Sequence, residues 1–456
     1  MLMKKILLQL FKNSLAIFAV GFIPLSATAE QGNAKPNFVF ILIDDMGWRD
    51  LGCYGSTFYK SPNIDKLAAR GMKFTQAYAA CPVCSPTRAS ILTGKYPARL
   101  HLTDWLPGRP DKTNQMLSRP QINQQLPLEE ITLAKALKPA GYVSACIGKW
   151  HLGEHEFRPQ HQGFDFAFAG NQRGGEPGSK EQGKGEFGLT TQAETFIEKN
   201  KDKPFFLYLP YYSVHIPLLI KQELIAKYQK QIPPGQPQTN AVYAAMIESL
   251  DTCIGRIVRK LDELKLTEKT VVIFFSDNGG LSVHEGANTP ATSNFPLREG
   301  KGYLHEGGIR EPLIVVWPGM IQPKSICETP VCSIDFFPTI SEIAGIKSTA
   351  KIDGLSFLPL LKQTGKFQRD AIYWHYPHYS NQGGRPGGAI RVGDFKLIEN
   401  YEDGRLELFN LKDDLSEQND LAEKMPDKAL ELEEKLDLWR RQVEAQMMMP
   451  NPDYEP

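Results

Sequence analysis

Four short apolar segments, each followed by residues that can carry chemistry, constrain the fold of this chain most. They run over 37–43, 142–147, 205–209 and 271–275, and amphipathic helical patterns lie at 63–70, 132–138 and 241–264. Unbroken apolar runs of this length are typical of parallel strands that are buried on both faces. Because strands and helices alternate, we predict an α/β fold with a large, mostly parallel sheet flanked by helices.

Polar side chains stand where each predicted strand ends. They are Asp44 and Asp45 after the first run, Lys149 and His151 after the second, His215 after the third, and Asp277 and Asn278 after the fourth. Open α/β sheets bind ligands outside the carboxyl ends of their strands. We therefore expect these side chains to line one crevice.

The pattern changes after about residue 370. Short alternating runs at 389–392, 395–399 and 406–410 are separated by turn signals such as Gly393-Asp394, and a charged amphipathic helix is predicted over 426–447. These features indicate antiparallel hairpins followed by one helix. We predict an α/β domain over residues 30–365 and a small C-terminal α+β subdomain over residues 366–456.

The N-terminus has the pattern of a secretory signal peptide. Lysines at positions 4, 5 and 12 precede an apolar run over 14–25, and Ala27-Thr28-Ala29 provides a cleavage site after Ala29. The apolar run is short for a membrane span, which favours a signal peptide over the alternative, a retained anchor. We expect removal of residues 1–29 and a secreted or periplasmic protein with no membrane association thereafter.

The charge balance argues against a nucleic-acid partner. The 456 residues include 52 basic and 52 acidic side chains, and no stripe of Lys and Arg stands out. Any anionic ligand must therefore be bound by a local group of charges.

The segment around Cys84 contains the signals of a helix start. Ser85 is a suitable N-cap, Pro86 suits the first helical position, and Gly94 is a plausible stop. Cys84 would then lie at the positive end of a helix dipole, with Arg88 one turn further on, which favours an anion. The alternative is that Cys81-Pro82-Val83-Cys84 is a redox or zinc pair, although no second such pair exists to complete a zinc site.

Cys84-Ser85-Pro86-Thr87-Arg88, followed by Thr93-Gly94, resembles the signature of the type I, formylglycine-dependent sulfatases of the alkaline phosphatase superfamily. Further motifs occur in the order found in that arylsulfatase-like family: Asp44-Asp45, Gly148-Lys149-Trp150-His151-Leu152-Gly153, His215, Asp277-Asn278-Gly279-Gly280 and Gly300-Lys301-Gly302. The similarity extends over nearly the whole chain after residue 29. It implies an alkaline phosphatase-like fold.

The resemblance implies a modified residue and one metal ion per chain. A maturation enzyme would oxidise Cys84 to Cα-formylglycine, whose hydrate attacks sulfur through one hydroxyl and expels sulfate through the other. Asp44, Asp45, Cys84, Asp277 and Asn278 would hold Ca²⁺, since hard oxygen ligands suit it; a tighter octahedral arrangement would suit Mg²⁺ instead.

The resemblance also implies the roles of five further side chains. Arg88 would stabilise the nucleophile together with the metal, and Lys149 and Lys301 would hold the sulfate oxygens. His151 would remove a proton when sulfate is expelled. His215 would donate a proton to the leaving sugar oxygen, a role that calls for a group titrating near neutrality.

Substrate contacts are expected on loops near the strand ends. The candidates are Asp104, Trp105, Arg298, Glu299, His375 and His378. The sequence thus predicts a sulfatase that releases inorganic sulfate from a sulfated polysaccharide or glycosaminoglycan fragment.

Two alternatives belong to other classes of function. A formylglycine-dependent phosphonate or phosphate ester hydrolase would use the same residues, and extra positive charge near Lys149 and Lys301 would favour it; the motifs contain none. A sugar-binding pseudo-sulfatase would keep Cys84 as a thiol, for instance in a disulfide with Cys81.

Overall fold

The computed structural model describes residues 35–170, 183–232, 234–347 and 350–455, so the predicted signal peptide lies outside the described residues. The strands are β1 (Asn37–Ile43), β2 (Met72–Tyr78), β3 (Leu117–Ser118), β4 (Val143–Ile147), β5 (Phe166–Phe168), β6 (Phe205–Pro210), β7 (Thr270–Ser276), β8 (Arg310–Val316), β9 (Ser325–Cys327), β10 (Val331–Cys332), β11 (Ile372–Tyr376), β12 (Gly387–Val392), β13 (Phe395–Asn400), β14 (Leu406–Asn410) and β15 (Met449–Pro450). The helices are α1 (Pro62–Ala69), α2 (Cys84–Thr93), α3 (Leu133–Leu137), α4 (Glu186–Lys199), α5 (Gln222–Gln229), α6 (Ala241–Glu263), α7 (Glu306–Ile309), α8 (Phe336–Ile343), α9 (Leu358–Leu361) and α10 (Pro426–Gln442).

The predicted large sheet has nine strands. Its order is β10-β2-β8-β7-β1-β6-β4-β5, with β9 also paired to β2. The neighbours from β7 through β5 are all parallel, whereas β8 runs antiparallel to both β7 and β2. The prediction of a mostly parallel sheet flanked by helices is confirmed.

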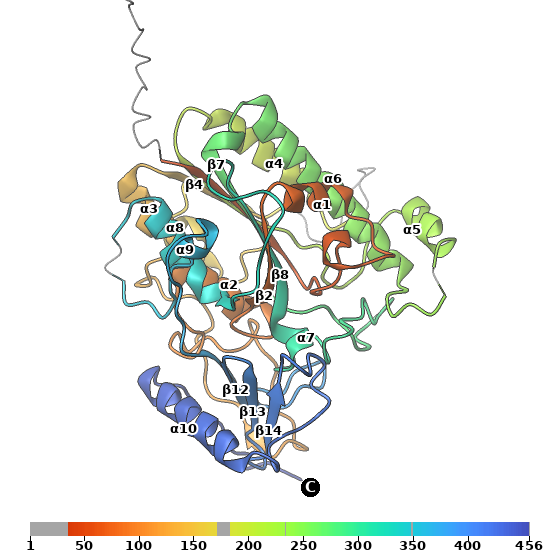
Figure 1. The fold of residues 1–456 in the computed structure, drawn as a ribbon, viewed down its shortest axis with the longest axis vertical. Helices are drawn as coiled ribbons and strands as arrows, with labels where there is room; N and C mark the ends of the chain where they lie inside the picture. Colours follow the sequence, from red (N-terminus) through yellow and green to blue (C-terminus); the bar gives the residue numbers. More distant parts are fainter. Residues whose placement is uncertain (1–34, 171–182, 233, 348–349, 456) are drawn as a thin grey trace, which may run out of the picture. The chain divides into compact units, whose positions relative to one another are not determined.

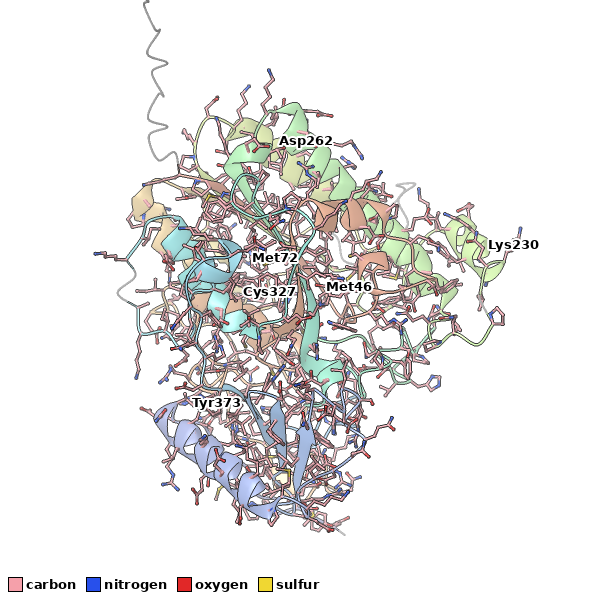
Figure 2. The ribbon with its side chains drawn as sticks, in the orientation of Figure 1. Met46, Met72, Lys230, Asp262, Cys327 and Tyr373 are labelled. Carbon is pink, nitrogen blue, oxygen red and sulfur yellow. The ribbon has the colours of Figure 1, made fainter. Side chains whose placement is uncertain are left out.

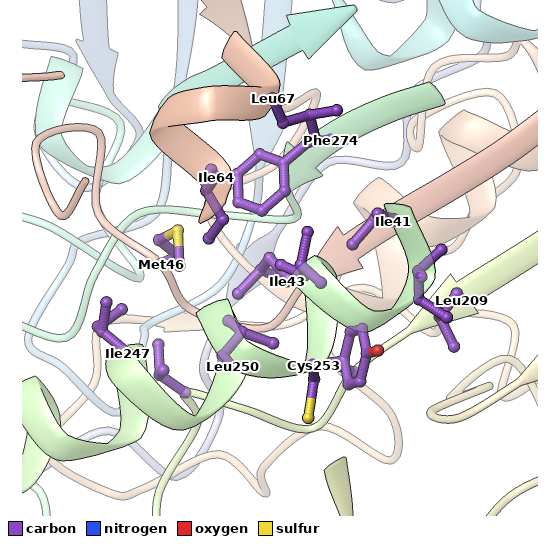
Figure 3. Close-up of a cluster of buried hydrophobic side chains, with 14 of the residues drawn as sticks. Ile41, Ile43, Met46, Ile64, Leu67, Leu209, Ile247, Leu250, Cys253 and Phe274 are labelled. Carbon is purple, nitrogen blue, oxygen red and sulfur yellow. The ribbon is translucent and has the colours of Figure 1, made fainter. Parts of the chain in front are cut away.

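Helices cover both faces of this sheet (Figure 1). Alternate side chains of β1 point to opposite faces, as the period of a strand requires. Ile41 and Ile43 pack with α1, α4 and α6 on one face, and Figure 3 shows Ile43 beside Leu250 of α6. Phe38, Phe40 and Leu42 pack with α2, α3 and α8 on the other face. The buried apolar runs seen in the sequence follow from this double cover.

The register of the central strands brings their carboxyl ends level. Ile43 of β1 pairs with Ser276 of β7, and the amide of Asp277 donates to the carbonyl of Ile43 at 3.0 Å. On the other side, Leu42 pairs with Pro210 of β6. Residues that follow these strands therefore emerge side by side at one edge.

A second, antiparallel sheet of order β11-β12-β13-β14 packs with α10 around its own buried cluster. Figure 1 shows α10 lying along β12, β13 and β14. The indole of Trp374 in β11 donates to the carbonyl of Ala79, at 2.8 Å, which joins this sheet to the chain just after β2. The predicted small α+β part is confirmed as an architecture.

Helix α10 ends at Gln442, five residues before the predicted end at Met447. Glu444 has a left-handed backbone with φ of 56°, which a continuing helix does not allow. The chain then extends, and Met449 pairs with Ser118 of β3. None of the helices in the described ranges combines the length and the apolar character needed to cross a membrane.

Lys396 in β13 forms a fully buried ion cluster that links the small antiparallel sheet to α7. Its Nζ lies 3.0 Å from Glu306 of α7 and 2.8 Å from Glu417, and all three side chains have no exposure. Burial alone would raise the pKa of Glu306, but the charges of Lys396 and Arg310 lower it to about 2. Removal of the lysine would leave Glu417 without this ion pair and Glu306 with Arg310 as its remaining cation.

We expect Lys396→Met to lower the free energy of unfolding by about 3–5 kcal/mol, because it strands buried acidic groups. The midpoint of urea unfolding, followed by far-UV circular dichroism, measures this. Lys230→Met is the matched control, since Lys230 is exposed after α5 and points away from the protein (Figure 2). Equal midpoints for both variants would show that the cluster does not stabilise the fold.

Candidate active site

Helix α2 begins at Cys84, two residues earlier than the predicted first helical residue, Pro86. Val83 occupies the N-cap position without a side-chain bond, and the Ser85 hydroxyl accepts instead from the amide of Leu106 at 3.1 Å. The predicted stop is right, since Gly94 takes the left-handed conformation with φ of 70°. Cys84 is thus the first residue of a buried helix and lies at its positive end.

Three carboxylates and one amide meet at the ends of β1 and β7. Ligand atoms of Asp44, Cys84 and Asp277 all lie within 4.8 Å of one another. Asn278 Nδ2 donates to Asp45 at 2.8 Å, and the Asp45 amide donates to Asp277 at 3.2 Å. The five residues predicted as metal ligands are therefore brought together.

Three cations are interleaved with these carboxylates. Arg88 Nη2 lies 2.6 Å from Asp277 and 3.4 Å from Asp44. Lys149 Nζ lies 2.7 Å from Asp44, and Lys301 Nζ lies 2.7 Å from Asp45. The opposite charges neutralise one another, which is what allows so many ionised groups to be buried together.

This donor set fits a divalent metal ion. The Oδ1 atom of Asn278 is buried and has no hydrogen-bond partner, although a buried carbonyl oxygen ordinarily has one. Burial, together with the negative charge of Asp44, raises the pKa of Asp277 to about 7 in spite of Arg88. Carboxylate and amide oxygens are ligands that Ca²⁺ and Mg²⁺ accept. A divalent cation here would bind to the clustered carboxylates and to the unpartnered Oδ1 atom of Asn278.

His151 is held as a neutral base beside Cys84. Its Nε2 lies 2.6 Å from the Leu106 carbonyl, so this nitrogen carries the proton, and Nδ1 faces Cys84 Sγ at 3.3 Å as an acceptor. Burial, reinforced by Lys149, lowers the pKa of His151 to about 3. An unprotonated nitrogen is therefore available next to residue 84 at neutral pH.

His215 lies across the carboxylate group, with Nε2 at 3.6 Å from Asp45. Its Nδ1 donates to the carbonyl of Ile216 at 2.5 Å. Burial and the charge of Lys301 lower the pKa of His215 to about 4, whereas the acid role inferred from the sequence calls for titration near neutrality. In the free site His215 is thus neutral, with Nε2 directed at the charged groups.

The thiols of Cys81 and Cys84 are separate. Cys81 Sγ contacts the carbonyl of Thr103 at 3.7 Å, while Cys84 Sγ faces His151, and all seven cysteines in the described residues are free. The disulfide considered as an alternative does not form in this structure.

A cavity of about 880 Å³ opens onto this group of residues. Its wall includes Asp44, Cys84, Lys149, His151, His215 and Lys301. Arg88, Asp45, Asp277 and Asn278 lie behind that wall and hold its residues in place through the contacts given above. A ligand in the cavity would meet the lysines and histidines directly.

Of the six predicted substrate contacts, only Trp105 lines the cavity. The polar groups of the other five bond to protein partners: Asp104 to Tyr376, Arg298 to the Glu417 carbonyl, Glu299 to His305, His375 to Tyr401 and the Gln446 carbonyl, and His378 to Thr103. In this structure they position loops and strands around the site instead of facing a ligand.

Several cavity residues carry no signal in the sequence. Lys184, Tyr212, Glu285 and Gln382 line the wall, outside every motif. Lys184 stands just before α4, in a Gly- and Lys-rich stretch whose composition indicates only a loop. The motifs mark residues around the reacting group, but they do not mark the wall that a larger ligand would touch.

Comparison with known proteins shows the family to which the chain belongs. Residues 36–346 match the sulfatase family, and residues 299–444 match the C-terminal family of N-sulphoglucosamine sulphohydrolase. The sulfatase of Formosa agariphila is 31% identical over 94% of this chain and 93% of its own length. Human arylsulfatase A is 32% identical over 79% of this chain and 74% of its own length.

A solved structure is also similar. The crystal structure of Ps i-CgsB in complex with k-i-k-neocarrahexaose has a TM-score of 0.76 and 28% identity, and the match covers 89% of this chain and 92% of the other. The family match spans more than half of the chain, and the similar relatives span most of their own lengths. The protein therefore belongs to the sulfatase family and is an enzyme that acts as a sulfatase.

Proposed function

We propose that the enzyme releases inorganic sulfate from a sulfated saccharide, using residue 84 as formylglycine and a bound Ca²⁺ ion. The observation that carries this proposal is the neutral Nδ1 of His151, 3.3 Å from Cys84 Sγ, inside a ring of three carboxylates and three cations. The saccharide is supported by relatives whose names include N-acetylgalactosamine-6-sulfatase, and by the neocarrahexaose bound to Ps i-CgsB.

Ca²⁺ and formylglycine would supply two kinds of chemistry. Bound by Asp44, Asp45, Asp277, Asn278 and residue 84, Ca²⁺ would act as a Lewis acid that favours an anionic nucleophile. Formylglycine would supply a hydrated aldehyde, whose hydroxyl is nucleophilic towards sulfur.

The chain's own residues would bind and polarise the ester. Lys149 and Lys301 line the cavity and would bind sulfate oxygens, where charge develops as the ester bond breaks. Arg88 anchors Asp277 through two hydrogen bonds, of 2.9 and 2.6 Å, and fixes the carboxylate behind residue 84. Because the charges within the site otherwise cancel, a divalent cation would leave it positive, which favours an anionic ester.

The two histidines would move protons. His151 Nδ1 is placed to accept a proton from residue 84, since its other nitrogen is committed to Leu106. His215 would donate from Nε2 to the leaving sugar oxygen. Its pKa is low in the free site, but the negative charge of a bound ester would raise the pKa and favour the protonated form.

We also propose that residues 1–29 direct export as a signal peptide, that residues 30–365 form the catalytic domain, and that residues 366–456 form the C-terminal subdomain.

A maturation enzyme would act on Cys84 before the helix is buried, because Cys84 is only 2% exposed in the folded protein. Modification of the unfolded or nascent chain follows from that burial.

We expect Cys84→Ala to lower the turnover of 4-nitrophenyl sulfate by at least about 10³-fold, because it removes the nucleophile. The thermal midpoint should stay near that of the wild type. Mass spectrometry of the wild-type peptide that contains residue 84 should detect formylglycine. Turnover by Cys84→Ala at the wild-type rate would exclude this mechanism, while an unmodified, inactive wild type would favour the pseudo-sulfatase.

His215→Ala should affect substrates according to their leaving groups. Sugar sulfates need protonation of the departing oxygen, so we expect their kcat/KM to fall by about 10²–10⁴-fold. Nitrophenyl sulfate has a stable leaving anion, and we expect a fall of less than about tenfold. Rates of sulfate release from both substrates measure this. Equal losses on the two would show that His215 does not act as the acid.

Removal of the metal should lower both stability and turnover. Protein treated with a chelator should unfold at a lower temperature. Addition of Ca²⁺ at about 100 times its Kd should raise the free energy of unfolding by about 2.7 kcal/mol. Asn278→Ala should reduce this Ca²⁺-dependent gain, because it removes the buried Oδ1 atom that lacks a partner. If neither chelation nor Ca²⁺ changed the midpoint, these residues would not form a metal site. Parallel titrations with Mg²⁺ would establish which ion binds more tightly.

A further inference from the structure

A buried lysine that belongs to none of the motifs lines the active-site cavity. Lys184 is only 5% exposed, and its Nζ donates to the carbonyl of Ile216 at 3.2 Å. Four Lys and Arg side chains occur along the described cavity wall: Lys149, Arg158, Lys184 and Lys301. The other three lie within 4 Å of a carboxylate, but Lys184 forms no ion pair with any described residue. Its charge is left for a ligand.

The contacts of Lys184 place it beside the proposed proton donor. The carbonyl of Ile216 accepts from both Lys184 Nζ and His215 Nδ1. His215 would face the oxygen that leaves with the sugar. Lys184 therefore lies on the side of the cavity where His215 stands, whereas Lys149 and Lys301 approach the carboxylates of the proposed metal site.

The backbone that carries Lys184 is anchored. Its amide donates to Glu186 at 2.8 Å, and the second oxygen of Glu186 accepts from Ser249 of α6 at 2.7 Å. A lysine fixed in this way loses less freedom when a ligand binds. Burial and the charge of Lys149 lower the pKa of Lys184 although Asp44 opposes this shift, and an approaching anion would favour the charged form.

Other cavity residues give the wall a pattern of charge. Glu285 accepts from Gln382 at 2.5 Å, so one part of the wall carries an acid held by an amide. Trp105 adds an aromatic surface suited to the apolar face of a sugar ring. An anionic substituent would be repelled by Glu285 and attracted by Lys184, which restricts how a charged sugar can bind.

We propose that Lys184 binds a second anionic group of the substrate, so that the preferred substrate is a sugar that carries, beside the scissile sulfate ester, another sulfate or a carboxylate. This inference rests on the proposed function, since it assumes that a sulfated sugar occupies the cavity. It assigns Lys184 to substrate selection and leaves bond cleavage to the residues described above.

The test compares Lys184→Met, Lys184→Arg and the exposed control Lys230→Met. The probes are matched pairs of pyranoside sulfates, with and without a second sulfate on the neighbouring carbon, and matched hexose and hexuronate sulfates. Nitrophenyl sulfate reports on cleavage of an ester that carries no sugar, and nitrophenyl phosphate presents a dianionic transferred group. Each protein is assayed for kcat/KM after its formylglycine content is checked. Binding of each probe to the same variants in a Cys84→Ala background is measured by calorimetry.

We expect the wild type to prefer the doubly anionic member of at least one pair, and Lys184→Met to reduce that kcat/KM by at least about tenfold, as for loss of a charged hydrogen bond. Lys184→Met should keep nitrophenyl sulfate turnover within about twofold of the wild type, and Lys184→Arg should retain most of the preference. The disulfate and hexuronate arms distinguish which anion is bound.

Three outcomes would overturn the proposal. The wild type could cleave singly charged sugars as well as their doubly charged partners. Lys184→Met could lower kcat/KM equally for every substrate, which would place the lysine at the transferred sulfate. It could also selectively impair phosphate monoesters, which would assign its charge to a dianionic transferred group. Failure of fully converted wild type to cleave any sulfate ester, nitrophenyl sulfate included, would instead refute the proposed function itself.

Discussion

The site depends on the mutual neutralisation of three buried carboxylates and three buried cations. An isolated ion in such a place would cost several kcal/mol, and the cost is offset only if each ion has a partner. Arg88 bridges Asp277 and Asp44, Lys149 holds the other side of Asp44, and Lys301 holds Asp45. The arrangement is balanced before any ligand arrives. A divalent cation would shift that balance to positive charge, and an anionic ester would restore it.

The parallel sheet makes this arrangement possible. Because β1 and β7 are adjacent and in register, Asp44 and Asp277 leave the sheet next to each other, and no loop has to bring them together. Helix α2 adds Cys84 and Arg88. Every residue of this helix is buried. The reactive groups therefore stand on strand ends and one helix start, which are the rigid parts of the fold. The cavity wall beyond them comes from connecting segments, where residues such as Lys184 and Glu285 stand.

That division explains how much of the protein could be predicted from its sequence. Strand ends follow from apolar runs, so the sequence alone is enough to place Asp44 and Asp277 together. The predicted start of α2 is wrong by two residues, because the hydroxyl of Ser85 bonds to Leu106, a distant partner that no local signal contains. His375 lies in β11 of a buried antiparallel sheet and bonds to Tyr401, and His378, which follows that strand, is buried with its Nε2 bonded to Thr103, so neither histidine faces the cavity. Lys184 gives no signal, since burial of a lysine in a Gly-rich stretch depends on tertiary packing.

The positions of the three cavity lysines, Lys149, Lys184 and Lys301, separate two tasks within one site. Lys149 and Lys301 pair with carboxylates of the proposed metal site, so their charge would act where every substrate presents the same sulfate group. Lys184 shares only a carbonyl with His215, so its charge acts on the part of the substrate that differs between sugars. Charge near the sulfate is fixed by the reaction, because a change there alters catalysis on all substrates. Charge beyond His215 is free to vary with the substrate, since the proton donor can be retained while the wall around it changes.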